Sequence, residues 1–417
     1  MSADETAKQG LTLPINLALG LGAYTTKLYF GSEQVAVNVM LDTGSSTLAI
    51  DLEKYQPEND QHLQTTTYAQ DVVYGSGGWA GPVLRSQIEL DHEQNVVLND
   101  APFAITADSQ QANFQQADGI WGLAYHHLNK AYDVSTYLQT QNPALDSTHP
   151  WPFSVADTPK GIKAFRTYLH QFPEHDITPL FTDFEDHGIV PNRFSLITHR
   201  SIEYVPQADM DLAAREQEPL NQGAFIIGGA LPARPKQTLQ VVHDAYYNTE
   251  LLGCQLAGFD FCAAPPLDAQ HVNSFFSNAI IDSGCSFLVL QKNLYAYFMD
   301  CLEQIDARFK DMTQAATTAF QQGQDYHPKA LDPAQWPDLT LTFKGLDGEP
   351  VALVVPPHCY WQNHAQRPNN WMFMVMNQMP QWPDQTLCGL PLINNYHCVF
   401  DRSQQGLGVI HCLPKPS

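Results

Sequence analysis

The chain has 417 residues, of which 44% are apolar and 16% charged, and this composition excludes collagen-like, low-complexity and disordered proteins. Lys and Arg number 21 against 44 Asp and Glu, which gives a formal net charge of −23. A chain this acidic repels nucleic-acid phosphates and anionic lipids, so we expect neither as a partner. No stretch reaches the roughly 18 apolar residues of a membrane span. In the start MSADETAKQG acidic residues come first, and the first apolar patch after it is too short and interrupted for a secretory signal. We therefore expect a cytoplasmic protein whose eight cysteines are reduced.

Short runs rich in β-branched and aromatic residues, broken by Gly, Pro, Asn and Asp, predict a mainly β protein with few helices. The predicted strands lie within 27–41, 71–84, 194–198, 223–229, 339–345 and 373–376. Helical patterns occupy 161–172 and 293–312. The segment 126–170 is rich in His, Pro, Asn and Asp, and we interpret it as a surface insertion.

The chain contains an internal repeat. Residues 41–50 read LDTGSSTLAI and residues 281–290 read IDSGCSFLVL. Each is followed later by an apolar–apolar–Gly triplet, at 120–122 and at 387–389. Two similar halves of this kind predict two lobes built on one plan. The stretch around 200–222 is polar and poor in strand signals, so we place the lobes at 1–205 and 206–417.

The repeated Asp-Thr/Ser-Gly triplets suggest a chemistry. Such a triplet places a carboxylate just after a strand, and its glycine lets the backbone turn tightly. Two such loops facing each other would bring Asp42 and Asp282 together, and like charges at short range favour sharing one proton. A pair in that state can deprotonate a bound water and protonate a carbonyl oxygen. The pattern therefore predicts amide hydrolysis without a covalent intermediate.

Together these motifs resemble the pepsin family of aspartic peptidases. The matching segments follow the family's order: DTGSS at 42–46, YGSGGWAG at 74–81, DGIWGLAY at 118–125, FSLIT at 194–198, GAFIIGG at 223–229, DSGCS at 282–286 and VFDRSQQGLGVI at 399–410. The resemblance implies a bilobal fold of two pseudo-symmetric β lobes. It also implies a monomeric endopeptidase that needs no cofactor, acts on polypeptides at acidic pH, prefers hydrophobic residues at the cut and is inhibited by pepstatin. The absence of a signal and of a basic prosegment is similar to the bacterial homologues of the shewasin type.

The resemblance also implies roles for single residues. Asp42 and Asp282 match the catalytic pair. The residues expected to support them are Thr43, Gly44, Ser45, Ser283, Gly284 and Cys285. Among these, Ser45 is expected to hydrogen-bond the outer carboxylate oxygen of Asp42. The residues expected in the flap over the substrate, or in contact with the substrate, are Tyr74, Gly75, Ser76, Trp79 and Ile120.

Two positions depart from the family pattern. Cys285 replaces a Ser or Thr, and a thiol is a weaker donor than a hydroxyl, so activity is expected to extend further toward neutral pH. Ala49 occupies a position where the family often has a Trp that holds the flap tyrosine. Neither the 16 His nor the eight Cys show a metal-ligand spacing, so no metal is predicted. A non-proteolytic binding or regulatory protein on the same fold stays open as the alternative, because a fold does not fix a function.

Overall fold

The computed structural model describes residues 10–74, 77–110, 114, 116–153, 161–231, 237–403 and 406–416. It is mainly β and divides into two compact units. Unit 1 is Thr25–Pro191, and unit 2 combines residues 10–24 with the chain from Asn192 onward. Among the described residues, no helix is both long and apolar enough to cross a membrane.

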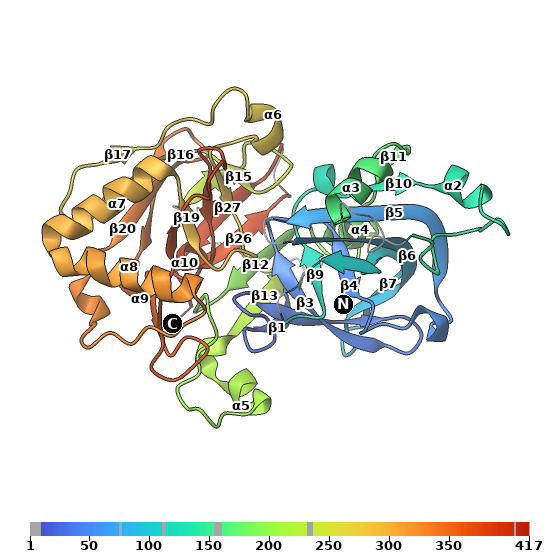
Figure 1. Cartoon of the computed structure of the whole chain (residues 1–417), viewed down its shortest axis with the longest axis horizontal. Helices are drawn as coiled ribbons and strands as arrows, with labels where there is room; N and C mark the ends of the chain where they lie inside the picture. Colours follow the sequence, from blue (N-terminus) through green and yellow to red (C-terminus); the bar gives the residue numbers. More distant parts are fainter. Residues whose placement is uncertain are drawn as a thin grey trace. The chain divides into compact units, whose positions relative to one another are not determined.

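Unit 1 is built on strands, several of which are almost entirely buried. β2 and β3 form an antiparallel hairpin in which Leu28 lies opposite Val37, and both side chains are fully buried. The strand order is β11-β10-β5-β6-β7-β4-β9-β3-β2, and β8 pairs with β6 (Figure 1). The strands are β2 (Thr25–Phe30), β3 (Val35–Asp42), β4 (Leu48–Asp51), β5 (Gln64–Tyr74), β6 (Gly77–Asp91), β7 (Val96–Thr106), β8 (Asp108–Gln110), β9 (Gly119–Gly122), β10 (Lys130–Asp133) and β11 (Glu174–Asp176). The α-helices of this unit are α2 (Ser135–Gln139), α3 (Gly161–Leu169) and α4 (Leu180–Asp186).

Unit 2 contains several sheets. One has the order β1-β13-β12-β26-β27-β14, and the others are β15-β18-β25-β19-β24, β17-β16-β20-β21 and β22-β23. The strands are β1 (Leu11–Asn16), β12 (Arg193–Ile197), β13 (Gln222–Ile227), β14 (Thr238–Gln240), β15 (Asn248–Thr249), β16 (Leu251–Leu256), β17 (Cys262–Ala263), β18 (Ala279–Ile281), β19 (Leu288–Leu290), β20 (Leu339–Lys344), β21 (Pro350–Val355), β22 (Trp361–Asn363), β23 (Trp371–Phe373), β24 (Val375–Asn377), β25 (Thr386–Cys388), β26 (His397–Asp401) and β27 (Val409–Leu413). The α-helices are α5 (Leu212–Gln217), α6 (Val272–Phe275), α7 (Lys292–Ile305), α8 (Ala307–Gln321), α9 (Pro357–Tyr360) and α10 (Leu390–Ile393).

The division between the units lies after Pro191 and not at 205/206. The reason is strand pairing: β12 pairs with β13 and with β26, and the N-terminal β1 pairs with the other edge of β13. The backbones of β12 and β13 are close, because a Cβ atom at Gly223 would lie 2.4 Å from the carbonyl oxygen of Ile197. The glycine-rich stretch 223–229 is thus largely a tightly packed strand.

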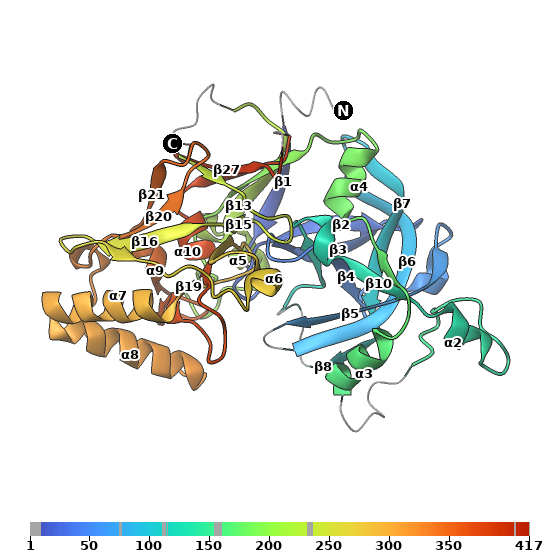
Figure 2. The ribbon, with the colours of Figure 1, turned by 90° about the horizontal axis from the view of Figure 1, so that it is seen from above.

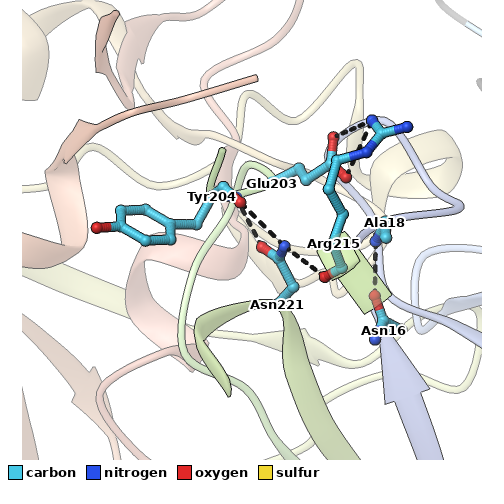
Figure 3. A network of polar contacts seen from close by, with 6 residues as sticks. All are labelled: Asn16, Ala18, Glu203, Tyr204, Arg215 and Asn221. Atoms are coloured by element: carbon cyan, nitrogen blue, oxygen red, sulfur yellow. Dashed lines mark hydrogen bonds and ion pairs between the residues drawn. The ribbon is translucent and has the colours of Figure 1, made fainter. Parts of the chain in front are cut away.

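The polar stretch 200–222 is a fixed part of unit 2 (Figure 3). Asn221 is fully buried, and its side chain accepts from the amide of Tyr204 at 2.6 Å and donates to the carbonyl of Arg215 at 2.9 Å. Arg215 also lies 3.4 Å from the carboxylate of Glu203, whose pKa is raised by burial. Local composition suggested a boundary between lobes here because buried polar contacts give no apolar pattern in the sequence.

The predicted helix over 293–312 is two helices, α7 and α8. The break is at Asp306, whose backbone is extended and whose side chain accepts a hydrogen bond from the amide of Arg308 at 3.0 Å. An aspartate that accepts from an amide two or three residues later is a standard helix N-cap. The Asp side chain therefore begins α8 and ends α7.

Candidate active site

Asp42 is the last residue of β3, and hydrogen bonds fix the loop that follows it. The amide of Gly44 donates to Asp42 Oδ1 at 2.7 Å, and the amide of Leu123 donates to the Asp42 carbonyl at 2.7 Å. The hydroxyl of Ser46 donates to the carbonyl of Tyr125. Asp42 is buried, so its carboxylate has a defined orientation within unit 1.

Gly122 ends β9 and lies directly behind this loop. β9 runs parallel to β3, with Asp42 opposite Gly122, and antiparallel to β4. A Cβ atom at position 122 would lie 2.5 Å from backbone atoms of Ser46 and Thr47. Only glycine allows the two backbones to approach this closely.

Asp282 directly follows β18, and its loop has a similar set of contacts within unit 2. The amide of Gly284 donates to Asp282 Oδ1 at 2.9 Å, and the amide of Asp282 donates to the Cys388 carbonyl at 3.1 Å. The hydroxyl of Ser286 donates to the carbonyl of Gly22 at 2.5 Å. The Gly amide bond to Oδ1 is the same as at Asp42, whereas the Ser hydroxyl bonds to a different part of the chain in each unit.

Gly389 has the same position behind the second loop. β25 runs parallel to β18 and antiparallel to β19, and Gly389 follows its last residue. A Cβ atom at 389 would lie 2.3 Å from the carbonyl oxygens of Cys285 and Phe287. The amide of Leu390 donates to the Cys285 carbonyl at 2.9 Å. The repeated sequence thus places a glycine close behind each Asp loop, once in each unit.

The other residues predicted to support the two Asp differ in their hydrogen bonds. Thr43 and Ser283 are both buried. The oxygen of Ser45 is buried too, but it makes no hydrogen bond with any residue that the structure describes, so the expected bond to Asp42 is not made. The thiol of Cys285 donates to the carbonyl of Phe287 at 3.2 Å.

Cys388 is a buried thiol beside the second loop. Burial raises the pKa of this thiol, and the proximity of Cys285 and Asp282 raises it further. A thiol with a raised pKa stays protonated and is a poor nucleophile. All eight cysteines lie in the described part of the chain, and none is in a disulfide. The geometry at Asp282 therefore favours carboxylate chemistry over thiol chemistry.

The predicted flap falls partly outside the described residues. Tyr74 ends β5 and pairs with Gly77 at the start of β6, whereas Gly75 and Ser76 are not described. Trp79 is fully buried, and Ile120 in β9 is only 3% exposed. These two side chains pack inside unit 1 and are not exposed for contact with a ligand.

Two supporting residues, Ser46 and Ser286, were not among those predicted from the sequence. Each is the sixth residue of its repeat, and each donates its hydroxyl to a backbone carbonyl. The signal was present, because the DTGSS and DSGCS segments agree at this position. Elsewhere in the part of the chain that the structure covers, no group of three or more His, Cys, Asp or Glu could hold a metal ion.

Comparison with known families agrees with this geometry for the first loop. Residues 23–148 match the family model for eukaryotic aspartyl proteases. The matched region contains Asp42, the β5–β6 hairpin and Gly122, and it ends before the second Asp-Ser-Gly. The match supports a pepsin-like aspartyl protease domain and, in general terms, aspartic peptidase activity.

Proposed function

We propose that this protein is an aspartic endopeptidase in which Asp42 and Asp282 form the catalytic pair. The observation that supports this is the duplicated Asp loop. In both loops a Gly amide donates to Asp Oδ1, a Ser hydroxyl fixes the turn, and a second glycine lies behind the backbone. The Gly amide bond to Asp Oδ1 and the closely packed glycine are common to both loops, and a turn aspartate without a functional role has no need of such a second copy.

The proposed chemistry follows from two carboxyls that share one proton. The ionised member takes a proton from a bound water as the water attacks the scissile carbonyl carbon. The protonated member donates its proton to the carbonyl oxygen, so a tetrahedral diol forms. The carboxyl that took the proton of the water then donates it to the amide nitrogen, while the other carboxylate takes a proton from a diol hydroxyl. The C–N bond breaks, and an amine and a carboxylic acid are released. No covalent bond to the enzyme is formed at any step.

The finer parts of the proposal concern conditions and substrate. We propose that the two units are the pseudo-symmetric lobes of one bilobal enzyme, related to the bacterial type of pepsin homologue. An acidic optimum is expected because only a pair that holds one proton contains both an acid and a base. Hydrophobic residues beside the cut and inhibition by pepstatin are expected from the resemblance. A monomer in the cytoplasm stays a prediction, which size-exclusion chromatography and cell fractionation would test.

The deciding experiment is cleavage of a denatured protein at about pH 4, with and without pepstatin. The variants are Asp42→Ala and Asp282→Asn, and the matched control is Asp209→Asn, which changes an exposed aspartate with no role in the site. Cleavage should disappear in both site variants and with pepstatin, and persist in the control. Cleavage that survives either site variant would refute the proposal. The absence of cleavage from about pH 3 to about pH 7 would favour a binding protein instead.

A further inference from the structure

The segment that the sequence suggested was a surface insertion forms a layer on the β5–β6 hairpin. We call residues 126–153 and 161–176 the brace. Its strand β10 extends the sheet beside β5, with Tyr132 opposite Ala69, and β11 pairs with β10. Its helix α3 lies against β5, β6 and β8 (Figure 2). The hairpin whose tip is the predicted flap therefore has the brace packed on one face.

Small residues of the hairpin allow this close packing. Ala69 and Ala80 are fully buried and lie in one apolar cluster with Phe165 and Leu169 of α3. Asp71 lies opposite Ala80 and, two residues after Ala69, points to the same face of β5. The Asp71 carboxylate therefore lies beneath α3, where the other contacts between the helix and the hairpin are apolar.

Asp71 is contacted there by two basic side chains of the brace, one Arg and one His. Only 2% of its side chain is exposed. The Nε2 atom of His170 lies 3.1 Å from Asp71 Oδ1, and the Nε atom of Arg166 lies 3.5 Å from Asp71 Oδ2. The His170 ring stacks on Tyr132, with ring centroids 4.5 Å apart. A buried carboxylate is costly unless it is paired, so the contacts with Arg166 and His170 favour keeping the hairpin packed against α3.

Asn129 provides a second anchor, between the hairpin and the Asp42 loop. Its Oδ1 accepts from Gln70 Nε2 at 2.8 Å and from Thr47 Oγ1 at 3.0 Å. All three residues are buried. Gln70 is the neighbour of Asp71 in β5, and Thr47 follows the Asp42 loop. One amide oxygen of the brace therefore links the hairpin to the loop that carries the candidate catalytic carboxylate.

We propose that the brace sets the position of the flap hairpin relative to the Asp42 loop, with Asp71 and Asn129 as positioning residues. The proposal rests on the proposed function, because hairpin position matters for catalysis only if the Asp42 site hydrolyses peptides. Neither residue is expected to touch the reacting atoms. Loss of either anchor would let the hairpin move while the Asp42 loop keeps its own hydrogen bonds.

Hydrogen–deuterium exchange tests the anchoring without any need for activity. In Asp71→Asn and in Asn129→Ala, amides of residues 64–74 and 77–84 should exchange about tenfold faster than in the wild type. Arg166→Ala should have the same effect, and Arg166→Lys, which keeps a cation beside Asp71, should restore slow exchange. The control is Arg308→Ala, which removes an ion pair from a side chain that is 82% exposed in unit 2. Unchanged exchange in the hairpin of both Asp71→Asn and Asn129→Ala would overturn the proposal.

Peptide kinetics separate positioning from simple loss of folded enzyme. The two anchor variants should raise KM about tenfold and change kcat by less than about twofold, because the hairpin would bind substrate less well while the carboxylates are intact. A variant that only reduces the folded fraction would lower the apparent kcat and leave KM unchanged, and that result would also overturn the proposal. If the wild type cleaves no peptide, the proposed function fails, and the exchange experiment still decides whether the brace holds the hairpin.

Discussion

Gly122 and Gly389 lie directly behind the two Asp loops, and replacing either by alanine tests whether loop position controls activity. The change adds one methyl group and alters neither carboxylate. It also leaves the donors of each loop in place. Any loss of activity beyond a loss of folded protein must therefore come from displacement of the loop.

The size of the displacement follows from the distances. The new Cβ atom would lie 2.5 Å from the loop backbone at position 122 and 2.3 Å from it at position 389, whereas ordinary contact begins at 3.4 Å. The neighbours are backbone atoms, which cannot rotate away, so the loop must move by about 1 Å, a shift that can cost about 100-fold in rate. Overpacking of this kind also costs about 1–3 kcal/mol of stability. We expect kcat/KM to fall about 100-fold in each variant, with a moderate fall in Tm.

The assay compares initial rates of peptide cleavage with thermal unfolding of the same samples. Gly188→Ala and Gly323→Ala serve as controls, one in each unit. Both glycines have φ of +66° and no atom within 4 Å of an added Cβ. Each control thus strains the backbone by about 1 kcal/mol without pushing on a loop. If Gly389→Ala lost no more activity than Gly323→Ala at equal loss of Tm, the inference that Gly389 positions the Asp282 loop would be wrong.

Three further predictions follow from single contacts. Burial raises the pKa of Asp401, but the contacts with His411 and Ser403 outweigh burial and lower the pKa to about 2. Asp401→Asn should therefore lower the free energy of unfolding by about 2 kcal/mol at pH values above about 4. The difference in unfolding free energy between the wild type and the variant should vanish as the pH falls through about 2. If urea unfolding gave the same difference at every pH, this prediction would be wrong. A thiol reagent should titrate eight groups in the denatured chain and, at early times in the native protein, only the half-buried Cys262 and Cys285; fewer than eight would reveal a disulfide. Cys285→Thr should move the upper limb of the pH–rate profile to lower pH, and an unmoved limb would refute the role given to the thiol.

The local parts of the fold could be predicted from the sequence, whereas long-range pairings could not. The runs 194–198 and 339–345 are β12 and β20 almost residue for residue, because a strand has its own pattern of apolar and β-branched residues. By contrast, β1 belongs to unit 2 because Leu11 pairs with Ile227, and nothing in either segment encodes its distant partner. Likewise, nothing in the sequence of the brace indicates that it packs on the β5–β6 hairpin.

At the candidate site, the predictable residues were those whose backbone geometry restricts the choice of amino acid. Gly122 and Gly389 must stay glycine because an added Cβ would clash with the loop backbone. Ser46 and Ser286 keep a hydroxyl because an apolar side chain would leave a carbonyl unpaired. The role expected of Ser45 was wrong in detail. Whether its hydroxyl makes a hydrogen bond depends on the side-chain rotamer, which the sequence does not specify.

The sequences of the two repeats are similar in the Asp loops and much less similar in the cores around them. Trp121 and Cys388 occupy matching places, one residue before the glycine behind each loop, and both are fully buried. Their volumes differ greatly, which shows that each unit fills this place with its own set of neighbours. A core position requires apolar volume that can be shared among several side chains, so it tolerates exchange. A loop position that requires the absence of a Cβ, or one hydroxyl at one carbonyl, has no neighbour that can compensate. Similarity confined to such positions is therefore what two copies of one Asp loop should retain when the cores around them have changed.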